Sequence, residues 1–263
     1  MWDTVELGRE IAKRFDLSHV LVVPSVSRDD ARNLQETVRR AAPFFQNLVR
    51  NGDKIGVAWG ATLLALSKRL HARQLSESTV FQITGNLDNA DSNTYAHEIM
   101  RHFSQKMMLK ALHTLPCPII VENSFIIDLL KHDSKISGIM SQINQVDMVF
   151  PNIGVMGQEN CLWSTGYVSS DMMLSLEEKG SVGCVCSRFI NDKGEIVDSL
   201  LNERTIGIAL SALRTARYSC ACVTASKKVP PLLGCLRSGL VNVLAIDTNT
   251  AVTLLECAQS YTA

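Results

Sequence analysis

The clearest candidate for ligand chemistry in this sequence is a junction between a strand-like segment and a helical one. A glycine and small residues stand at this junction. Trp59, Gly60, Ala61 and Thr62 stand between a β-branched run and leucines at helical spacing. A helix that begins there presents unpaired backbone N–H groups and a partial positive charge, which suit a phosphate group. Gly60 permits close backbone approach, and the Thr62 hydroxyl can donate to an anion. The pattern is equally consistent with a tight turn in which Thr62 only caps the helix.

Two further strand ends carry residues of this kind. They are Gly85, Asn86, Asn89 and Asn93 at the second corner, and Gly154, Met156 and Gly157 at the third. Asparagine side chains at such a corner bind sugar hydroxyls or cap the next helix, and capping is the slightly favoured interpretation. The glycines of the third corner let the backbone approach a ligand, but they serve a turn equally well.

Charged residues follow the last two strand-like segments. Lys228 comes after 218–223, where a lysine can meet a phosphate or a carboxylate, and Asp247 directly follows 241–246. The Asp247 carboxylate can accept hydrogen bonds from ligand hydroxyls. The plain alternatives are a solvated lysine and a cap for a helix that begins near Thr248.

Several kinds of site are missing from the sequence. There is no G-x-G, no G-x-x-x-x-G-K-[ST] and no G-x-S-x-G, so the usual dinucleotide, P-loop and hydrolase motifs are absent. His97 and His102 would point about 140° apart on a helix, so they cannot easily share a metal. The eight cysteines include no C-x-x-C pair and are expected to be buried, reduced thiols. We therefore expect neither a metal nor a cofactor.

Composition sets further limits on function. The 263 residues include 26 Lys plus Arg and 26 Asp plus Glu, so the formal net charge is zero. A neutral chain is not expected to hold nucleic acid by itself, because that requires a clustered basic surface. Hydrophobic residues make up 46%, which is enough for a core. No run approaches the ~20 apolar residues of a membrane span, and the N-terminus lacks a signal sequence, so a cytoplasmic protein is expected.

Strand-like and helical segments alternate along the chain. The expected strands are 54–59, 78–84, 147–153, 183–190, 218–223 and 241–246, with an interrupted edge strand within 112–121 and a first helix at 4–15. Such alternation predicts an α/β fold with a mostly parallel sheet and helices on both faces. A turn at 191–194 that leads back into 195–198 predicts a small antiparallel addition. The candidate corners would then share the edge where α/β sheets bind ligands.

A set of short motifs in a fixed order carries a family resemblance. They are GVAWGATL at 56–63, LPCP at 115–118, STGYV at 164–168, GSVG at 180–183, RF at 188–189, LNERTIGI at 201–208 and GLVNVL at 239–244. Each motif is weak alone, but the order is specific. Over residues 6–258 the sequence resembles the effector-binding domain of the SorC family of bacterial sugar-responsive transcriptional regulators.

The resemblance implies a function as well as a fold. It implies a Rossmann-like domain related to sugar-phosphate isomerases and CoA transferases, here a single domain over 1–263. A phosphorylated sugar or a related carbohydrate would bind across the strand ends and shift a homo-oligomer, a dimer or a tetramer, between two states. DNA would be contacted only through an N-terminal helix-turn-helix module that this chain does not contain. The chain itself would be a sensor and not an enzyme.

The resemblance also assigns site residues. It places a phosphate corner on Gly60, Ala61 and Thr62, a second corner on Gly85, Asn86 and Asn93, and a binding lysine on Lys228. Two positions depart from the family pattern, because Cys184 replaces an acidic residue after Gly183, and Thr224-Ala225 replaces a Gly-Gly pair before the lysine. These departures indicate an altered or degenerate pocket.

Two other functions stay open at this point. A sugar-phosphate isomerase or deaminase on a related fold would need a carboxylate base, and Asp88, Asp91 and Asp247 are candidates by position. An oligomerisation module that has lost its ligand would explain Cys184 and Thr224-Ala225. Fold alone does not decide between them.

Overall fold

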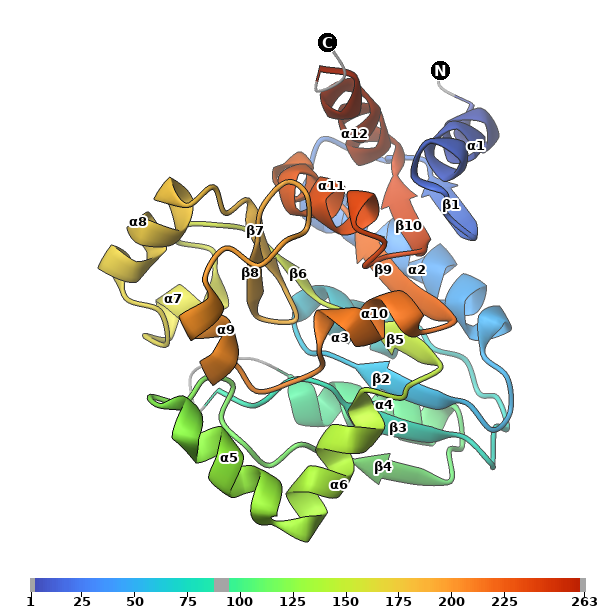
Figure 1. Ribbon diagram of the computed structural model, residues 1–263. Coiled ribbons are helices and arrows are strands. Elements are labelled where there is room, and N and C mark those ends of the chain that lie inside the picture. Colours follow the sequence, from blue (N-terminus) through green and yellow to red (C-terminus); the bar gives the residue numbers. More distant parts are fainter. Residues whose placement is uncertain (1–2, 88–94, 261–263) are drawn as a thin grey trace.

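A seven-stranded parallel sheet forms the centre of the molecule (Figure 1). The computed structural model describes residues 3–87 and 95–260. The sheet order is β1-β10-β9-β5-β2-β3-β4, and every neighbouring pair runs parallel. The strands are β1 (His19–Val23), β2 (Lys54–Val57), β3 (Thr79–Gln82), β4 (Ala111–His113), β5 (Met148–Phe150), β9 (Tyr218–Val223) and β10 (Val243–Asp247). The α/β architecture predicted from the sequence is therefore confirmed.

Helices cover both faces of this sheet. They are α1 (Thr4–Phe15), α2 (Asp30–Leu48), α3 (Ala61–Lys68), α4 (Ala96–Lys106), α5 (Ser124–His132), α6 (Ser134–Ile143), α10 (Leu210–Thr215), α11 (Val229–Arg237) and α12 (Thr248–Ser260). Helices α2, α3 and α4 pack side by side in one layer, and α1, α12 and α11 form a second packed series. All five residues of β10 are buried, as expected for a strand covered on both sides. Within the described ranges, no helix is long and apolar enough to cross a membrane.

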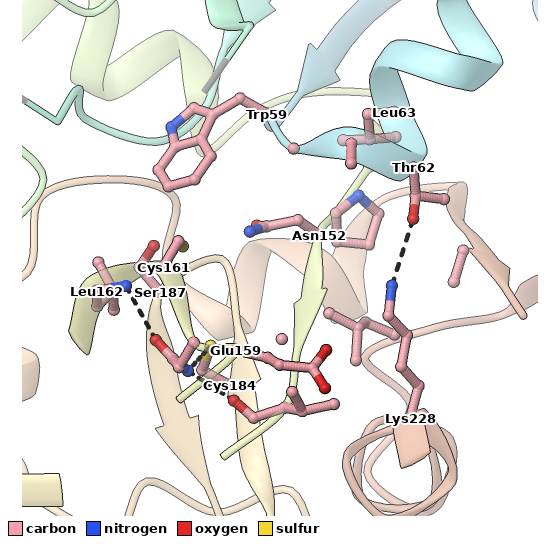
Figure 2. A pocket seen from close by; sticks show the side chains of 18 of the residues that line it. Trp59, Thr62, Leu63, Asn152, Glu159, Cys161, Leu162, Cys184, Ser187 and Lys228 are labelled. Carbon is pink, nitrogen blue, oxygen red and sulfur yellow. Dashed lines mark hydrogen bonds between the residues drawn. The ribbon is translucent and has the colours of Figure 1, made fainter. Parts of the chain in front are cut away.

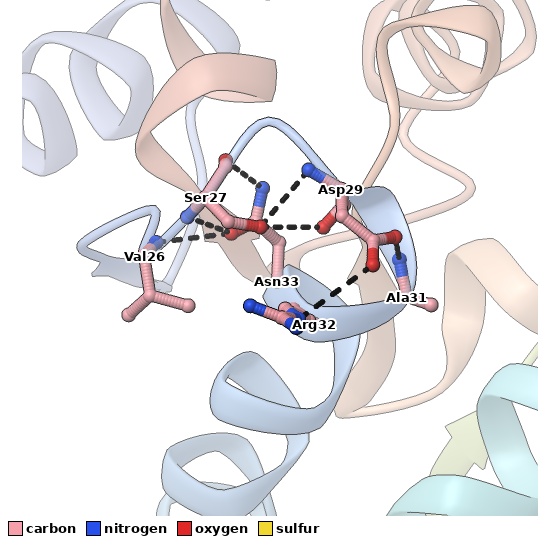
Figure 3. Close-up of polar contacts among 6 residues, drawn as sticks. All are labelled: Val26, Ser27, Asp29, Ala31, Arg32 and Asn33. Carbon is pink, nitrogen blue, oxygen red and sulfur yellow. Dashed lines mark hydrogen bonds and ion pairs between the residues drawn. The ribbon is translucent and has the colours of Figure 1, made fainter.

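The loop after β1 shows how the sequence fixes a helix start (Figure 3). The Asp29 side chain accepts a hydrogen bond from the Ala31 N–H, so α2 begins at Asp30. The buried Asn33 side chain accepts from the N–H groups of Val26 and Ser27 and donates to the Ser27 carbonyl. The Asp29 and Asn33 side chains thus form their hydrogen bonds within their own loop.

The small antiparallel addition is present, but its turn lies elsewhere than predicted. Strands β6 (Ile153–Gly154), β7 (Gly183–Val185) and β8 (Arg188–Ile190) form a three-stranded sheet. The expectation of one strand over 183–190 is wrong, because Cys186 and Ser187 reverse the chain with φ angles of 47° and 65°. The 191–194 turn also exists, but residues 195–198 contribute only the single bridge between Ile190 and Ile196.

Other element boundaries follow the prediction with characteristic differences. Helix α1 spans the predicted 4–15, and β9 spans the predicted 218–223. The strands predicted at 54–59 and 78–84 are present but shorter, and the one predicted at 241–246 is found at 243–247. Residues 112–121 leave the sheet after His113, because prolines follow. Strand β1 and helices α2, α5 and α6 were not anticipated. Asn93, the expected cap of α4, lies outside the described residues.

Arg188 ties the small sheet to the main one. Its buried guanidinium donates to the carbonyls of Ile208 (2.9 Å), Thr205 (3.2 Å) and Gly207 (3.2 Å). It also donates to the backbone and side-chain oxygens of Asn202, the latter at 2.5 Å. These acceptors lie in and after helix α9 (Ser199–Arg204), in a segment that bridges to Thr84 and Ile120 beyond β3 and β4. One side chain therefore fixes the β7–β8 hairpin relative to the sheet edge.

We expect Arg188→Met to lower the free energy of unfolding by about 3 kcal/mol or more, because several buried carbonyls would lose their donor. Chemical denaturation followed by circular dichroism measures this change. Arg32→Met is the matched control, since that side chain is 77% exposed and its loss should change stability by less than about 0.5 kcal/mol. Equal stabilities of the two variants would contradict the role assigned to Arg188.

Candidate functional site

A cavity of about 380 Å³ opens at the carboxyl ends of β2, β5 and β9 (Figure 2). The described residues that line it are 59–63, 151–155, 159–162, Cys184, Ser187, Ala221, Cys222, Lys227 and Lys228. They come from three corners of the main sheet and from the hairpin of the small one. This is the edge where parallel α/β sheets bind their ligands.

The first predicted corner lies in this cavity. Gly60 adopts a φ of 131°, a conformation that L side chains rarely adopt, and it is the N-cap of α3. Because Gly60 has no side chain to cap the helix, the first turn of α3 leaves backbone N–H groups without intrahelical partners. The alternative in which Thr62 caps α3 is wrong, since Thr62 lies inside the helix. Trp59 is buried, and its Nε1 donates to the Gly85 carbonyl at 2.9 Å.

Lys228 meets this corner from the opposite side. It ends a short 3-10 helix, η1 (Ser226–Lys228), just before α11 begins at Val229. Its Nζ donates to Thr62 Oγ1 at 3.3 Å, although 166 residues separate the two in sequence. Burial lowers the pKa of Lys228 below the ordinary lysine value. The side chain is therefore a partly desolvated cation beside an uncapped helix start.

A second lysine stands at the exposed side of the cavity. Lys227 Nζ forms an ion pair with Glu159 Oε2 at 2.5 Å, and both side chains are at least half exposed. Exposed pairs of this kind contribute little to stability. Glu159 is the carboxylate among the described lining residues, and it is already neutralised by its partner.

Residues that the sequence analysis did not select form the facing wall. The Oδ1 atom of Asn152 is buried without a hydrogen-bond partner, and the buried Ser187 lines the cavity nearby. Asn160 is fully used, because it accepts from the Leu162 N–H and donates to the Val155 carbonyl. Asn152 stands two residues after β5, so the strand-end rule that selected the other corners could have found it.

The second predicted corner packs against the site and does not line it. A Cβ atom at Gly85 would lie 2.4 Å from the Pro118 carbonyl oxygen, so the backbone is tightly packed there. The Asn86 side chain accepts from Gln82 and donates to the Leu115 carbonyl, both at 2.8 Å. Among the described residues, this corner therefore supports the Trp59 ring. Asn89 and Asn93 lie outside the described residues.

Three other candidates sit apart from the described lining. Met156 accepts a hydrogen bond from Ser181 Oγ, and Gly157 forms a turn with a φ of 76°. Asp247 is 1% exposed and accepts from the hydroxyls of Thr250 (2.5 Å) and Ser25 (2.7 Å). The Thr250 hydroxyl in turn accepts from the N–H of Ala225, which precedes the lysine turn. Asp247 thus positions that turn through Thr250. Gly154 and Cys184, in contrast, do line the cavity.

The thiols around the cavity are neutral and weakly polar. Burial raises the pKa of Cys184, Cys186 and Cys222 to about 12. Cys184 Sγ receives only a long contact from Asn160 Nδ2, at 3.6 Å. Within residues 3–87 and 95–260, no three His, Cys, Asp or Glu side chains are grouped so as to hold a metal ion.

These thiols should resist alkylation in the folded protein, because the thiolate is the reactive form. With iodoacetamide near pH 8, we expect appreciable labelling at the partly exposed Cys257 and slower labelling at Cys161, because burial also raises the pKa of Cys161. The six buried cysteines should react only after denaturation. Mass spectrometry of the labelled peptides gives the site-by-site rate, and fast labelling of Cys184 or Cys222 in native protein would contradict the burial described.

Comparison with known proteins gives one consistent family. The family model described as "Putative sugar-binding domain" matches residues 1–256. The deoxyribonucleoside regulator of Bacillus subtilis (strain 168) is 30% identical over 253 residues, which cover 96% of this chain and 80% of that protein. The sorbitol operon regulator of Klebsiella pneumoniae is 24% identical, covering 95% of this chain and 80% of that protein.

Solved structures agree with the sequence relatives. The full-length sorbitol operon regulator SorC from Klebsiella pneumoniae superposes with a TM-score of 0.88 at 23% identity, covering 96% of this chain and 81% of that one. A domain of a possible sugar-binding transcriptional regulator from Arthrobacter aurescens TC1 also gives 0.88, at 26% identity, with 97% and 98% covered. The fold is therefore shared along nearly the whole chain.

Proposed function

The chain belongs to the sugar-binding domain family of SorC-type bacterial transcriptional regulators, and from this membership we propose that it senses a phosphorylated sugar or a related small carbohydrate. The proposed ligand site is the cavity at the ends of β2, β5 and β9. The proposal adds two things to family membership, the phosphate group and the residues that hold it.

The contact between Lys228 and Thr62 is the observation that carries the proposal. A desolvated ammonium group and an uncapped helix start converge on one end of the cavity. A phosphate placed there would receive backbone N–H groups, a hydroxyl and a charge-assisted hydrogen bond from Lys228. Lys227 lies beside this end, where its charge is offset by the exposed pair with Glu159.

The other end of the cavity suits a carbohydrate ring. Figure 2 places the Trp59 ring across the cavity from the Thr62–Lys228 pair. Because Nε1 is already bonded to Gly85, the indole offers its apolar face and not its polar edge. A few polar groups in an otherwise apolar wall are typical of small-molecule pockets that fix one orientation.

In the proposed regulation, the ligand shifts a homo-oligomer, a dimer or a tetramer, between two states. It can do so only by binding one state more tightly than the other. DNA is contacted through a helix-turn-helix module and not through this domain, and the zero net charge of the chain supports that division. Sedimentation velocity with and without a sugar phosphate would test the oligomer shift.

The two rival functions have less support. An isomerase or deaminase needs a free carboxylate near the sugar, whereas Glu159 is paired and Asp247 is bonded to Ser25 and Thr250. Asp88 and Asp91 lie outside the described residues, so turnover of pentose and hexose phosphates by pure protein remains the direct test. The oligomerisation-only alternative does not account for an open cavity that ends on a desolvated lysine.

Thr62→Ala should weaken a phosphorylated sugar by about 1.5 to 3 kcal/mol, the usual contribution of a hydrogen bond to a charged group. Thr62→Ser keeps the hydroxyl and is the matched control. Isothermal titration calorimetry against ribose 5-phosphate, glucose 6-phosphate and fructose 6-phosphate measures the difference. Unchanged affinity of Thr62→Ala would remove Thr62 from the site. No binding and no thermal stabilisation by any of these ligands at millimolar concentration would contradict the proposed function.

Phosphate affinity should also fall at alkaline pH. Since burial lowers the pKa of Lys228, this amine loses its proton, and with it its attraction for phosphate, below the usual lysine range. Affinity should stay high above pH ~6, where a phosphate monoester becomes a dianion, and should decline at a pH below the usual lysine range. Lys228→Arg keeps its charge throughout and should give a flatter profile. Parallel profiles for the two proteins would contradict the role of Lys228.

A further inference from the structure

Ser187 occupies a backbone conformation that its residue type does not favour. Cys186 and Ser187, with φ angles of 47° and 65°, form a two-residue turn between the paired residues Val185 and Arg188. Hairpin turns with two positive φ angles are built mainly from Gly, Asn and Asp, because other side chains are strained there. Strain of this kind persists at functional sites, where the side chain has a use that outweighs it.

The Ser187 side chain faces the cavity and is free. It is 2% exposed and lines the cavity, and its hydroxyl has no hydrogen-bond partner within residues 3–87 and 95–260. The hydroxyl borders the cavity without a protein partner, so it is available to a ligand. Cys186, its neighbour in the turn, is equally buried but is not among the described lining residues.

A buried polar atom without a partner lies beside this turn. The Oδ1 atom of Asn152 is buried without a partner, and the Asn152 side chain lines the same cavity. The Asn152 carbonyl accepts from the Cys186 N–H at 3.1 Å, so the loop after β5 and the hairpin turn are directly joined. Arg188, the next residue, anchors the hairpin through its buried hydrogen bonds. The backbone segments that carry the two polar groups are therefore held together before any ligand binds.

The arrangement of the cavity gives these groups a role. In Figure 2, Ser187 lies with Trp59 on the side away from Thr62 and Lys228, and Asn152 lies between the two sides. A sugar phosphate with its phosphate at Lys228 would extend its ring toward Asn152 and Ser187. The rest of that wall includes Cys161, Leu162 and Cys184, which bond hydroxyls weakly or not at all.

We propose that Ser187 and Asn152 bind a sugar hydroxyl distant from the phosphate and so determine which phosphorylated sugar the domain accepts. This inference rests on the proposed function, because it assumes that the phosphate lies at Lys228. A ligand hydroxyl at this place can accept from the Ser187 hydroxyl and donate to the buried Asn152 Oδ1, whereas a ligand without one leaves Asn152 Oδ1 unpaired. Sites built in this way discriminate strongly against the ligand that lacks the group.

Glycine substitutions distinguish the effect of the Ser187 hydroxyl on affinity from the effect of the strained turn. Ser187→Gly removes the hydroxyl and relieves the backbone strain, so the protein should fold with no loss of thermal stability while its affinity falls about 5- to 10-fold. Cys186→Gly relaxes the same turn but leaves the Ser187 hydroxyl in place, and its affinity should stay within about twofold of wild type. Asn152→Ala should weaken binding as Ser187→Gly does. Calorimetry with ribose 5-phosphate, glucose 6-phosphate and fructose 6-phosphate supplies the affinities.

Inorganic phosphate identifies which end of the cavity is affected. All variants should bind it as wild type does, since the Lys228 end is unchanged. If wild type binds a sugar phosphate and both Ser187→Gly and Asn152→Ala bind it equally well, the hydroxyl subsite is refuted while the proposed function stands. If wild type binds neither inorganic phosphate nor any of the three sugars, both proposals fail. Ser187→Ala, which keeps a Cβ, repeats the test should the glycine variant not fold.

Discussion

Parallel pairing of all seven strands is the constraint on which the site depends. In a parallel sheet every carboxyl end reaches the same edge, so corners that are far apart in sequence become neighbours. Thr62 and Lys228 meet at 3.3 Å because β2 and β9 both flank β5 in the sheet. An antiparallel exchange at either strand would place one of the two groups at the opposite edge. The position of the cavity is thus set first by the direction of the strands, and the side chains then determine its chemistry.

The corners of this edge differ in what their polar groups do. After β1, the side chains of Asp29 and Asn33 bond to their own loop and leave nothing for a ligand. After β10, Asp247 is consumed by Ser25 and Thr250. After β2, by contrast, Gly60 cannot cap its helix, and the N–H groups of α3 stay open. Binding capacity at a sheet edge therefore depends on which corners leave their hydrogen bonds unmade.

The same difference between the corners explains which parts of the site could be predicted from the sequence. Alternating segments predicted the parallel sheet, and the strand-end rule led to Gly60, Thr62 and Lys228. The rule could not tell that Asn86 and Asp247 would bond inward, because that depends on Leu115, Gln82 and Thr250, which are distant or unremarkable in sequence. Ser187 was missed because its turn contains no Gly, Asn or Asp, so the hairpin read as one continuous strand. Residue propensities cannot predict a residue that adopts a backbone conformation its type does not favour.

The hydrogen-bond chain from Asp247 through Thr250 to the Ala225 N–H has a mechanical consequence. Thr250 belongs to the first turn of α12, and α12 packs against α1. A continuous set of contacts therefore joins the turn at Ala225–Lys228, which borders the cavity, to α12 and from there to α1. Helix α1, near the start of the described chain, and helix α12, near its end, lie side by side (Figure 1). The turn that carries Lys228 is thus connected to these helix ends by one hydrogen bond and one helix–helix contact.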